Sequence, residues 1–456
     1  MDKRVLIGVA GIFAVVLIVG LVFALSGGSD DDGDNGEVAE DSAQTEESTD
    51  DQAGDDDPAE GDETTPEEGA GEGEEEGEGE GEGATDQESQ EDETTAPVDD
   101  VPEEEVQLPT GEPQRPQSDA MAYGFNIAWR ADEEGQQYNE YTQQAVDTAG
   151  FNWVKFQVHW SEIQREPDWL DPAPVDRMVE LYEGTETRIL ISVVGAPEWA
   201  RDPNGEQLLA DYEPFVGFMA FMANRYQGRV HAWEIWNEQN MAREMHGTVR
   251  VSDYASLLEA GYRGVKDADP DALVVFGGLS PTGISDPEVA VNDVEYLEAF
   301  YLHGNGHYTQ FFDVLGMHLN ATNNPPDTTY PDNPGPGEWS DHNSFYFLRG
   351  QDQRQIMSDF GDERPVWITE FGWTTENSAE GYGYGADVSE ENQANYLTGA
   401  FDVAREQMPW VSGMFVWNLN FSTLVPAEDE KYAWSILYDN WSPRPAYTAL
   451  QEMPKP

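Results

Sequence analysis

The stretch Trp233-Glu234-Ile235-Trp236-Asn237-Glu238 decides the fold, because it combines a β-rich apolar run with a carboxylate at its end. The stretch Trp367-Ile368-Thr369-Glu370-Phe371-Gly372-Trp373 repeats this arrangement later in the chain. Since side chains alternate between the two faces of a strand, Glu238, Trp236 and Glu234 are predicted to share one face. The two stretches predict strands whose ends each present a glutamate.

Six further runs between residues 120 and 420 have the same short, apolar, β-rich character. The eight runs cover residues 123–128, 153–159, 188–194, 230–236, 273–278, 312–318, 366–371 and 413–418. The gaps leave room for helices, one of them predicted at 253–267 with Ser252 as its N-cap and Pro270 beyond its end. Strands alternating with helices are typical of βα units and a parallel sheet. Eight units predict an α/β fold, a (β/α)8 TIM barrel, whose active site lies at the C-terminal ends of the strands.

A doubly wound open sheet is the alternative fold. Such sheets usually carry a glycine-rich turn after the first strand. Here the corresponding stretch reads Asn126-Ile127-Ala128-Trp129 and contains no glycine. The barrel is therefore the favoured architecture.

The composition divides the 456 residues into three parts. Residues 1–26 are predicted to be a transmembrane anchor or a signal segment. Residues 27–118 hold 37 acidic residues and one basic residue, Arg115, and are predicted to be a disordered linker. All 14 tryptophans lie in residues 119–456, the predicted catalytic domain.

Residues 5–25 form an uncharged apolar run, preceded by Lys3 and Arg4. At about 1.5 Å per residue this run spans roughly 31 Å, the thickness of a bilayer core. The preceding positive charges predict that the domain lies outside the cell membrane. The alternative is a cleaved signal peptide, with Ala24-Leu25-Ser26 as the cleavage site and a secreted product.

The formal net charge of −70 and the absence of cysteine exclude several functions. Binding to nucleic-acid phosphates needs a basic face, so no nucleic-acid partner is expected. Disulfides, thiolate chemistry and cysteine-ligated metals are excluded. The acidity, with five lysines against 17 arginines, fits either adaptation to high salt or an acidic secreted protein.

Two glutamates at the mouth of one barrel point to glycosidic cleavage. One carboxyl group protonates the leaving oxygen, and the other attacks or stabilises the anomeric carbon. Asn237 adds an amide that can hydrogen-bond a sugar hydroxyl next to Glu238. The alternative reading makes both glutamates solvated loop residues.

The glutamate motifs resemble those of clan A, a large clan of retaining glycoside hydrolases. The resemblance rests on Trp236-Asn237-Glu238 and Ile368-Thr369-Glu370-Phe371-Gly372, on Asp269-Pro270 before the fifth strand, and on Ser442-Pro443-Arg444-Pro445-Ala446-Tyr447 near the end. It covers residues 120–452. Within the clan, the spacing looks most like family 39 and related bacterial exopolysaccharide glycosidases, and next like family 5 cellulases.

The resemblance implies hydrolysis of a β-linked polysaccharide or oligosaccharide by double displacement. Glu238 would be the acid/base and Glu370 the nucleophile, with carboxyl groups about 5–5.5 Å apart. A silent glycan-binding barrel and a transglycosylase using the same site are the alternatives. No cofactor and no metal are expected, and the pair His303 and His307 is read as a surface turn.

Glu234 is expected below the mouth, where an unpaired charge is costly. Alternation along the second strand places the Lys155 side chain inside the barrel, so a structural Glu234–Lys155 pair is predicted. The clan more often has arginine near that position. By the same alternation, the side chains of Trp233 and Trp367 are predicted to point out of the barrel and to pack between the strands and the helices.

The remaining substrate-binding candidates stand at predicted strand ends. The resemblance implies an aromatic platform at Trp417, a histidine at His318, and Asn320 where the clan often has tyrosine. The full set of predicted substrate-binding residues is Asn126, Trp129, His159, Trp160, Asn237, His318, Asn320, Trp373 and Trp417. Loops 321–343 and 374–389 follow strands six and seven and are expected beside the mouth.

Overall fold

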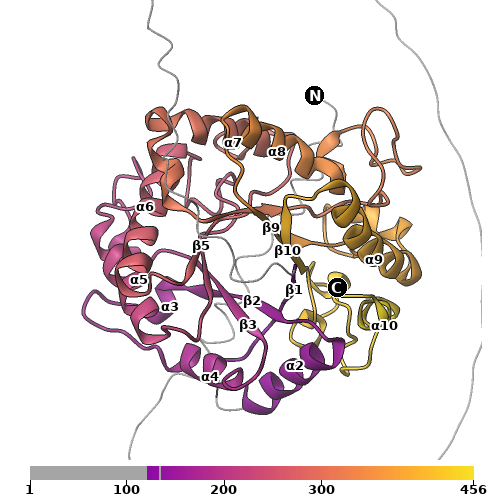
Figure 1. Ribbon diagram of the computed structural model, residues 1–456, viewed down its shortest axis with the longest axis horizontal. Coiled ribbons are helices and arrows are strands. Elements are labelled where there is room, and N and C mark those ends of the chain that lie inside the picture. Colours follow the sequence, from indigo (N-terminus) through magenta and orange to yellow (C-terminus); the bar gives the residue numbers. More distant parts are fainter. Residues whose placement is uncertain (1–120, 133–134, 456) are drawn as a thin grey trace, which may run out of the picture. The chain divides into compact units, whose positions relative to one another are not determined.

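The computed structural model describes residues 121–132 and 135–455, which include a closed barrel of eight parallel strands (Figure 1). Around the barrel the strands follow the order β1-β10-β9-β8-β5-β4-β3-β2, and β1 pairs with both β10 and β2. The strands are β1 (Ala122–Asn126), β2 (Trp153–His159), β3 (Arg188–Val194), β4 (Ala232–Ile235), β5 (Leu273–Phe276), β8 (Val314–His318), β9 (Val366–Phe371) and β10 (Val411–Val416). A small antiparallel pair, β6 (Ser285–Asp286) and β7 (Ala290–Val291), follows β5.

The helices cover the outside of the strands (Figure 1). They are α2 (Gly135–Ala149), α3 (Trp160–Ile163), α4 (Ala173–Leu181), α5 (Glu213–Arg225), α6 (Val251–Ala268), α7 (Asp293–Leu302), α8 (Gly350–Asp359), α9 (Glu390–Gln407) and α10 (Pro445–Glu452). Short 3-10 turns are η2 (Glu198–Ala200), η3 (His303–Phe311), η4 (Asn343–Phe345), η5 (Phe347–Arg349), η6 (Gly383–Asp387), η7 (Phe421–Thr423) and η8 (Tyr432–Trp434).

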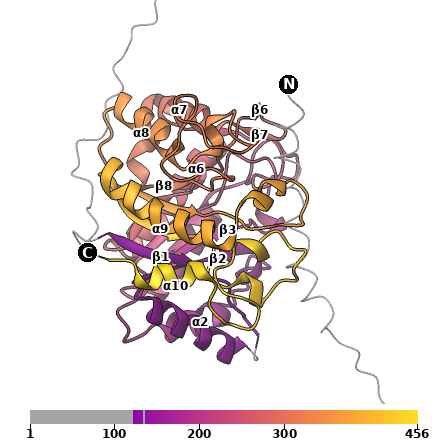
Figure 2. The same ribbon diagram turned by 90° about the vertical axis from the view of Figure 1, so that its right-hand side faces the viewer.

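The last helix closes the ring of helices. In Figure 2, α10 lies beside α9 and near α2. The Tyr447 hydroxyl of α10 donates to the Ala145 carbonyl of α2 at 2.8 Å, which ties the end of the domain to its first helix. The 442–447 segment therefore leads into the helix that closes the ring.

The predicted (β/α)8 barrel is confirmed, and the doubly wound sheet is excluded by the closed strand order. Strands two, three and seven have the predicted bounds, and the others differ by one or two residues at one or both ends. The predicted N-cap of α6 was wrong. Arg250 is the N-cap, and Ser252 lies inside the first helical turn. The helix therefore begins at Val251, two residues before the predicted start at Asp253.

The lower interior of the barrel is an apolar layer to which every strand contributes. Its members, which we call the lower layer, are Ala122, Trp153, Leu190, Ala232, Leu273, Val275, Val314, Trp367 and Phe415. The Trp153 and Trp367 rings meet edge to face at 5.0 Å. Gly124 makes room for this packing, since a Cβ there would lie 2.1 Å from the Phe415 ring.

The predicted outward orientation is confirmed for Trp233 and was wrong for Trp367. Trp233 is buried in the outer core, next to Tyr226. Trp367 belongs to the lower layer inside the barrel. The cause is a register shift along β9: Met317 pairs with Ile368, but the next residue, His318, pairs with Glu370. Such a bulge inserts one residue and reverses the alternation, so counting back from Glu370 gives the wrong face.

The predicted anchor at 1–26 and linker at 27–118 lie outside the described residues. Within 121–132 and 135–455, no helix combines the length and hydrophobicity that crossing a bilayer requires. Both N-terminal predictions therefore stay predictions.

Candidate active site

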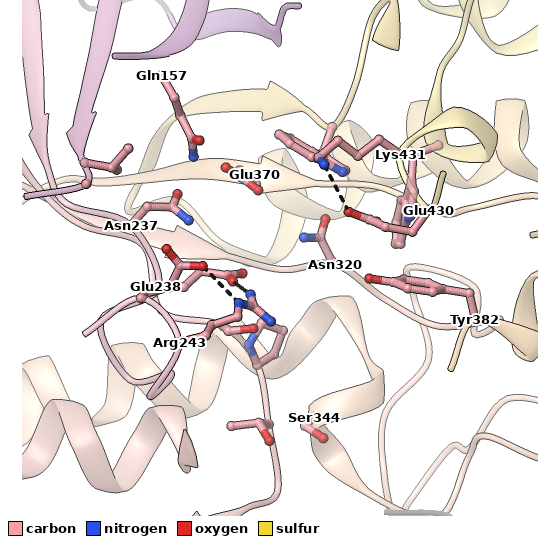
Figure 3. A pocket seen from close by; sticks show the side chains of 18 of the residues that line it. Gln157, Asn237, Glu238, Arg243, Asn320, Ser344, Glu370, Tyr382, Glu430 and Lys431 are labelled. Carbon is pink, nitrogen blue, oxygen red and sulfur yellow. Dashed lines mark hydrogen bonds and ion pairs between the residues drawn. The ribbon is translucent and has the colours of Figure 1, made fainter. Parts of the chain in front are cut away.

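A cavity of about 490 Å³ opens at the C-terminal ends of the strands, and both Glu238 and Glu370 line it (Figure 3). Glu370 is the fifth residue of β9, and Glu238 follows the end of β4 by three residues. The barrel places these ends at one rim, as expected for the fold. The predicted convergence of the two carboxylates on one site is confirmed.

Glu370 is fixed from below by a buried lysine. Lys155 Nζ lies 2.9 Å from Glu370 Oε1 and 2.8 Å from Glu234 Oε2. Lys155 and Glu234 are completely buried, and Glu370 is nearly so. One ammonium group therefore bridges two carboxylates in the upper interior of the barrel.

The predicted Glu234–Lys155 pair is confirmed, but its description as structural only needs correction. Because Lys155 also holds Glu370, it is part of the site. Burial alone lowers the pKa of Lys155, yet the charges of Glu234 and Glu370 raise it above its ordinary value. Burial alone raises the pKa of Glu234, and the charge of Lys155 lowers it below its ordinary value. The ammonium and carboxylate forms thus stabilise one another.

The backbone under Glu370 is held by a predicted site residue. Asn126, at the end of β1, donates through Nδ2 to the Thr369 carbonyl at 3.0 Å. Its side chain is buried below the cavity and does not line it. Asn126 therefore positions the strand that carries Glu370, and its predicted contact with sugar is not supported.

Glu238 sits on an irregular segment after β4. Trp236 and Glu238 have φ angles of 69° and 48°, in the left-handed region that side chains rarely adopt. The alternation along β4 therefore ends at Trp236, whose indole is buried in the outer core and donates to the Glu244 carbonyl at 3.0 Å. The predicted shared face of Glu234, Trp236 and Glu238 was wrong for Trp236.

Loops from the neighbouring strand hold this segment in place. The Glu238 amide donates to the Gly278 carbonyl at 2.9 Å. Asn240 and Ser280 exchange two hydrogen bonds, from Asn240 Nδ2 to the Ser280 carbonyl at 2.8 Å and from the Ser280 amide to Asn240 Oδ1 at 2.9 Å. These bonds stabilise a conformation that is unfavourable in isolation.

Glu238 contacts a histidine and an arginine. Its Oε1 lies 3.2 Å from His318 Nδ1, and its Oε2 accepts a hydrogen bond from Arg243 Nη2. Burial alone raises the pKa of Glu238, but the His318 hydrogen bond and the Arg243 charge lower it to about 2. The structure therefore holds Glu238 as a carboxylate near neutral pH.

His318 lies between the two glutamates. It ends β8, is fully buried, and its Nε2 lies 3.6 Å from Glu370 Oε1. Gly278 leaves the space that the imidazole occupies, since a Cβ there would lie 2.2 Å from the ring. The prediction that His318 belongs to the site is supported by these contacts, which reach both carboxylates from beneath the cavity.

Four other predicted residues line the cavity: His159, Asn237, Asn320 and Trp417. The amide oxygens of Asn237 and Asn320 are buried and accept no hydrogen bond from the described protein. The indole N–H of Trp434, which also lines the cavity, has no acceptor in the described protein either. Sugar hydroxyls can both donate to and accept from such groups.

Three predicted tryptophans do not line the cavity. Trp160 is fully buried, packs against Trp199 and donates to Gln164 Oε1 at 2.8 Å. Trp373 is fully buried and donates to the Asn324 carbonyl at 2.8 Å. Trp129 packs on Phe156 and donates to the Gln157 carbonyl at 3.3 Å. The structure therefore does not bring these three predicted residues to the cavity, because the face of a residue just beyond a strand is not set by alternation.

Loops 321–343 and 374–389 wall one side of the cavity, which confirms their expected place beside the mouth. They meet through the Asn323 Nδ2–Asp387 Oδ2 hydrogen bond at 2.9 Å and the edge-to-face contact of Trp339 with Tyr384 at 5.6 Å. Trp339, Tyr382 and Tyr384 all line the cavity. Their aromatic faces offer apolar contact to sugar C–H groups.

Several charged residues of the cavity were not predicted from the sequence. Arg243 and Glu244 follow Glu238 in the chain, while Arg201, Glu430 and Lys431 come from other loops. Burial raises the pKa of Glu430 to about 7, against the opposing effect of Lys431. Proximity to the Asn237-Glu238 motif was a usable signal for Arg243. The same proximity marked Glu244, but no local signal marked Arg201, Glu430 and Lys431, because separate loops bring them to the cavity.

The family model described as "Cellulase (glycosyl hydrolase family 5)" matches residues 114–420. No curated protein matches the chain. Among solved structures, similarity extends to a family 39 glycoside hydrolase from Bacteroides cellulosilyticus WH2, at 20% identity and a TM-score of 0.52. The alignment covers 72% of this chain and 62% of that one, so this chain spans less than two thirds of the relative.

A second similar structure is a variant of GH5_18 from Streptomyces cattleya in complex with Manb1-4GlcNAc. It is 13% identical, with a TM-score of 0.53 and coverage of 74% of this chain and 83% of that one. A psychrophilic family 10 endo-β-1,4-xylanase is 13% identical, with a TM-score of 0.50 and coverage of 74% and 98%. At these identities the structures establish the fold, and with the family model they confirm the clan A resemblance.

Proposed function

This chain belongs to glycosyl hydrolase family 5, and from that premise we propose that it is a retaining glycoside hydrolase that cleaves a β-linked polysaccharide or oligosaccharide. The observation that carries the proposal is the shared environment of Glu238 and Glu370, which line one cavity and contact opposite nitrogens of His318. Two carboxyl groups flanking one position are what double displacement requires.

In the proposed first step, a Glu370 oxygen bonds to the anomeric carbon while the bond from that carbon to the leaving oxygen breaks. The proton on Glu238 passes to the leaving oxygen. In the second step, Glu238 takes a proton from water, and the water oxygen displaces Glu370 from the anomeric carbon. Lys155 supports the first step because its ammonium group fixes the Glu370 oxygen that it contacts and holds the carboxylate in one orientation.

Hydrogen-bonding groups without protein partners support a sugar ligand. Asn237, Asn320 and Trp434 line the cavity beside aromatic side chains, and the buried amide oxygens and indole N–H of these residues have no partner in the described protein. Leaving such groups buried and unpaired is costly, so a ligand that satisfies them gains affinity. A sugar, with hydroxyls around an apolar ring face, fits this combination.

The first experiment is a trapping reaction on residues 119–456 with 2-deoxy-2-fluoro-β-glycosyl fluorides of glucose, mannose, xylose and galactose. These compounds slow the second step, so intact mass and peptide mapping are expected to show one adduct, on Glu370. Glu370→Gln should give no adduct, and the control Glu376→Gln, at an exposed position, should react like wild type. An adduct elsewhere would contradict the nucleophile assignment. No adduct with any sugar would favour a glycan-binding barrel.

We also propose that residues 1–26 anchor the enzyme in the cell membrane with the barrel outside. The proposal rests on the 21-residue apolar run at 5–25 and the preceding Lys3 and Arg4. Protease treatment of intact cells should release the barrel from cells expressing the full chain. A barrel found free in the medium, with a new N-terminus after residue 26, would instead show cleavage and secretion.

A further inference from the structure

Arg243 binds the catalytic carboxylate from inside the cavity. Its Nη2 donates to Glu238 Oε2, and its Nε donates to Glu244 Oε1 at 2.9 Å. The side chain is about one-fifth exposed and lines the same cavity as both catalytic glutamates. The guanidinium group is therefore within reach of a bound ligand.

This ion pair opposes the role proposed for Glu238. A general acid must carry a proton before the leaving bond breaks. A guanidinium group at hydrogen-bond distance favours the carboxylate form, and Arg243 itself stays charged. The titratable groups around Glu238 come from several elements: His318 from β8, Arg243 and Glu244 from the segment after β4, Glu370 from β9, and Tyr382 and Glu430 from the loops after β9 and β10. Of these, Arg243 is the permanent cation.

The position of Arg243 indicates which part of the substrate it meets. In Figure 3, Glu238 lies between Glu370 and Arg243. The nucleophile attacks one side of the anomeric carbon, and the leaving sugar departs toward the acid. Arg243 therefore faces the leaving sugar rather than the sugar that becomes bonded to Glu370.

A second arginine adds positive charge to the cavity. Arg201 lines it after β3, and its Nε donates to the Ala196 carbonyl at 2.9 Å. Among the described residues, no carboxylate lies within 4.0 Å of its guanidinium nitrogens. The neighbouring His246 remains neutral, because burial and the charge of Arg201 lower its pKa to about 4. Arginine thus supplies the positive charge at this end of the cavity.

We propose that the leaving-sugar subsite selects an acidic sugar, whose carboxylate binds Arg243 and releases Glu238 to take up a proton from solvent. This inference rests on the proposed function. A carboxylate can replace Glu238 at the guanidinium group with a bidentate, charge-assisted pair, whereas a neutral hydroxyl cannot match that interaction. The released Glu238 then donates its proton to the leaving oxygen.

The net negative charge of the domain disfavours acidic ligands, whereas the proposed subsite binds one. An acidic surface disfavours anionic ligands at low salt, but salt screens distant surface charges over about 10 Å at 0.1 M. A guanidinium group in direct contact inside a cavity is screened much less. The pairing of a ligand with Arg243 is therefore governed by the groups inside the cavity, where Arg243 contacts Glu238 and Glu244.

The test uses two β-linked disaccharides that carry the sugar trapped on Glu370. They differ only at C6 of the leaving sugar, which is glucuronate in one and glucose in the other. For the wild-type enzyme at pH 7, kcat/KM should be higher for the glucuronate disaccharide by about tenfold or more, since removing an adjacent opposite charge raises a carboxyl pKa by about 1–3 units. Equal values, or a preference for glucose, would overturn the proposal.

A variant identifies the residue responsible. Arg243→Gln should bring the two kcat/KM values to within about twofold of each other. For the glucose disaccharide, it should also move the basic limb of the pH–rate profile to higher pH, because Glu238 then stays protonated longer. The control Arg263→Gln removes a surface arginine paired with Glu213 and should behave like wild type.

The outcomes separate this inference from the proposed function. A glucuronate preference that survives in Arg243→Gln would assign selection to another group and overturn the role of Arg243. If that variant does not fold, the wild-type comparison still decides whether acidic leaving sugars are selected. An adduct on Glu370 without cleavage of either disaccharide would overturn the inference alone. The absence of any adduct would remove the proposed function.

Discussion

The two layers of the barrel interior differ sharply although they lie on the same strands. The lower layer is wholly apolar, while two residues further along β2 and β4 stand Lys155 and Glu234. Both charged side chains are as inaccessible to water as Leu190 below them. The difference shows that this interior accepts charge where a partner of opposite sign is within contact distance, as Lys155 is for Glu234 and Glu370.

The comparison assigns different tasks to the two layers. Apolar packing in the lower layer stabilises the fold, since its members fill the barrel across all eight strands. The upper layer, formed by Lys155 and Glu234, fixes the carboxylate of Glu370, the proposed nucleophile, and is stable only while every charge has its partner. Removing one partner of a buried ion pair leaves the other charge buried and unpaired, which lowers stability. Replacing the whole pair with apolar groups often leaves stability unchanged.

The largest effect is expected for Lys155→Met, which breaks the upper layer. Loss of the ammonium group leaves Glu234 and Glu370 buried without their cation, so the free energy of unfolding should fall by about 3–5 kcal/mol. Urea unfolding measures this loss. The double variant Lys155→Met/Glu234→Met should recover part of the stability, because Glu370 still lacks its cation, and none of the activity. A single variant as stable as wild type would contradict the pairing.

A comparable loss of stability, with a different kinetic signature, is expected for Leu190→Ala in the lower layer. Leu190 is fully buried, and truncation should cost about 2–5 kcal/mol through lost burial and a residual cavity. Below the unfolding transition, kcat/KM should stay within about twofold of wild type, because the charged groups above keep their contacts. A large fall in kcat/KM of the folded variant would show that the two layers are coupled.

The smallest effect concerns the pH dependence at Glu238. Its pKa is lowered from 4.5 to about 2, so the stability that its contacts provide is present above pH 4.5 and is lost as the pH falls toward 2. Wild type should therefore exceed Glu238→Gln by about 1–3 kcal/mol at pH 7. The difference should shrink between pH 4.5 and 2. A constant difference across this range, in urea unfolding at each pH, would argue against the depressed pKa.

Much of the site was predictable from the order of residues along strands. The placement of both glutamates at one rim follows from the fixed direction of parallel strands in the barrel. The Glu234–Lys155 pair follows from alternation along β2 and β4. The prediction failed where alternation itself fails. The bulge in β9 turned Trp367 inward, and the positive φ of Trp236 removed that side chain from the mouth.

The aromatic predictions show the same limit. Trp160 and Trp373 follow strands closely, as Trp417 does, yet only Trp417 lines the cavity. The chain beyond a strand end turns into a loop or a helix, and the direction of its first side chains depends on what packs against them. Trp160 packs with Trp199 in the outer core, a contact between separate βα units.

The sequence by itself determined the fold class and the placement of Glu238 and Glu370 at one rim, because periodicity and strand direction are local properties of the chain. The tertiary structure decided which charges act on those carboxylates. Lys155 reaches Glu370 across the barrel, and His318 on β8 touches both glutamates. Arg243 turns back from its own loop to bind Glu238. Electrostatic interactions depend on distance in space and on burial, and closure of the barrel sets both.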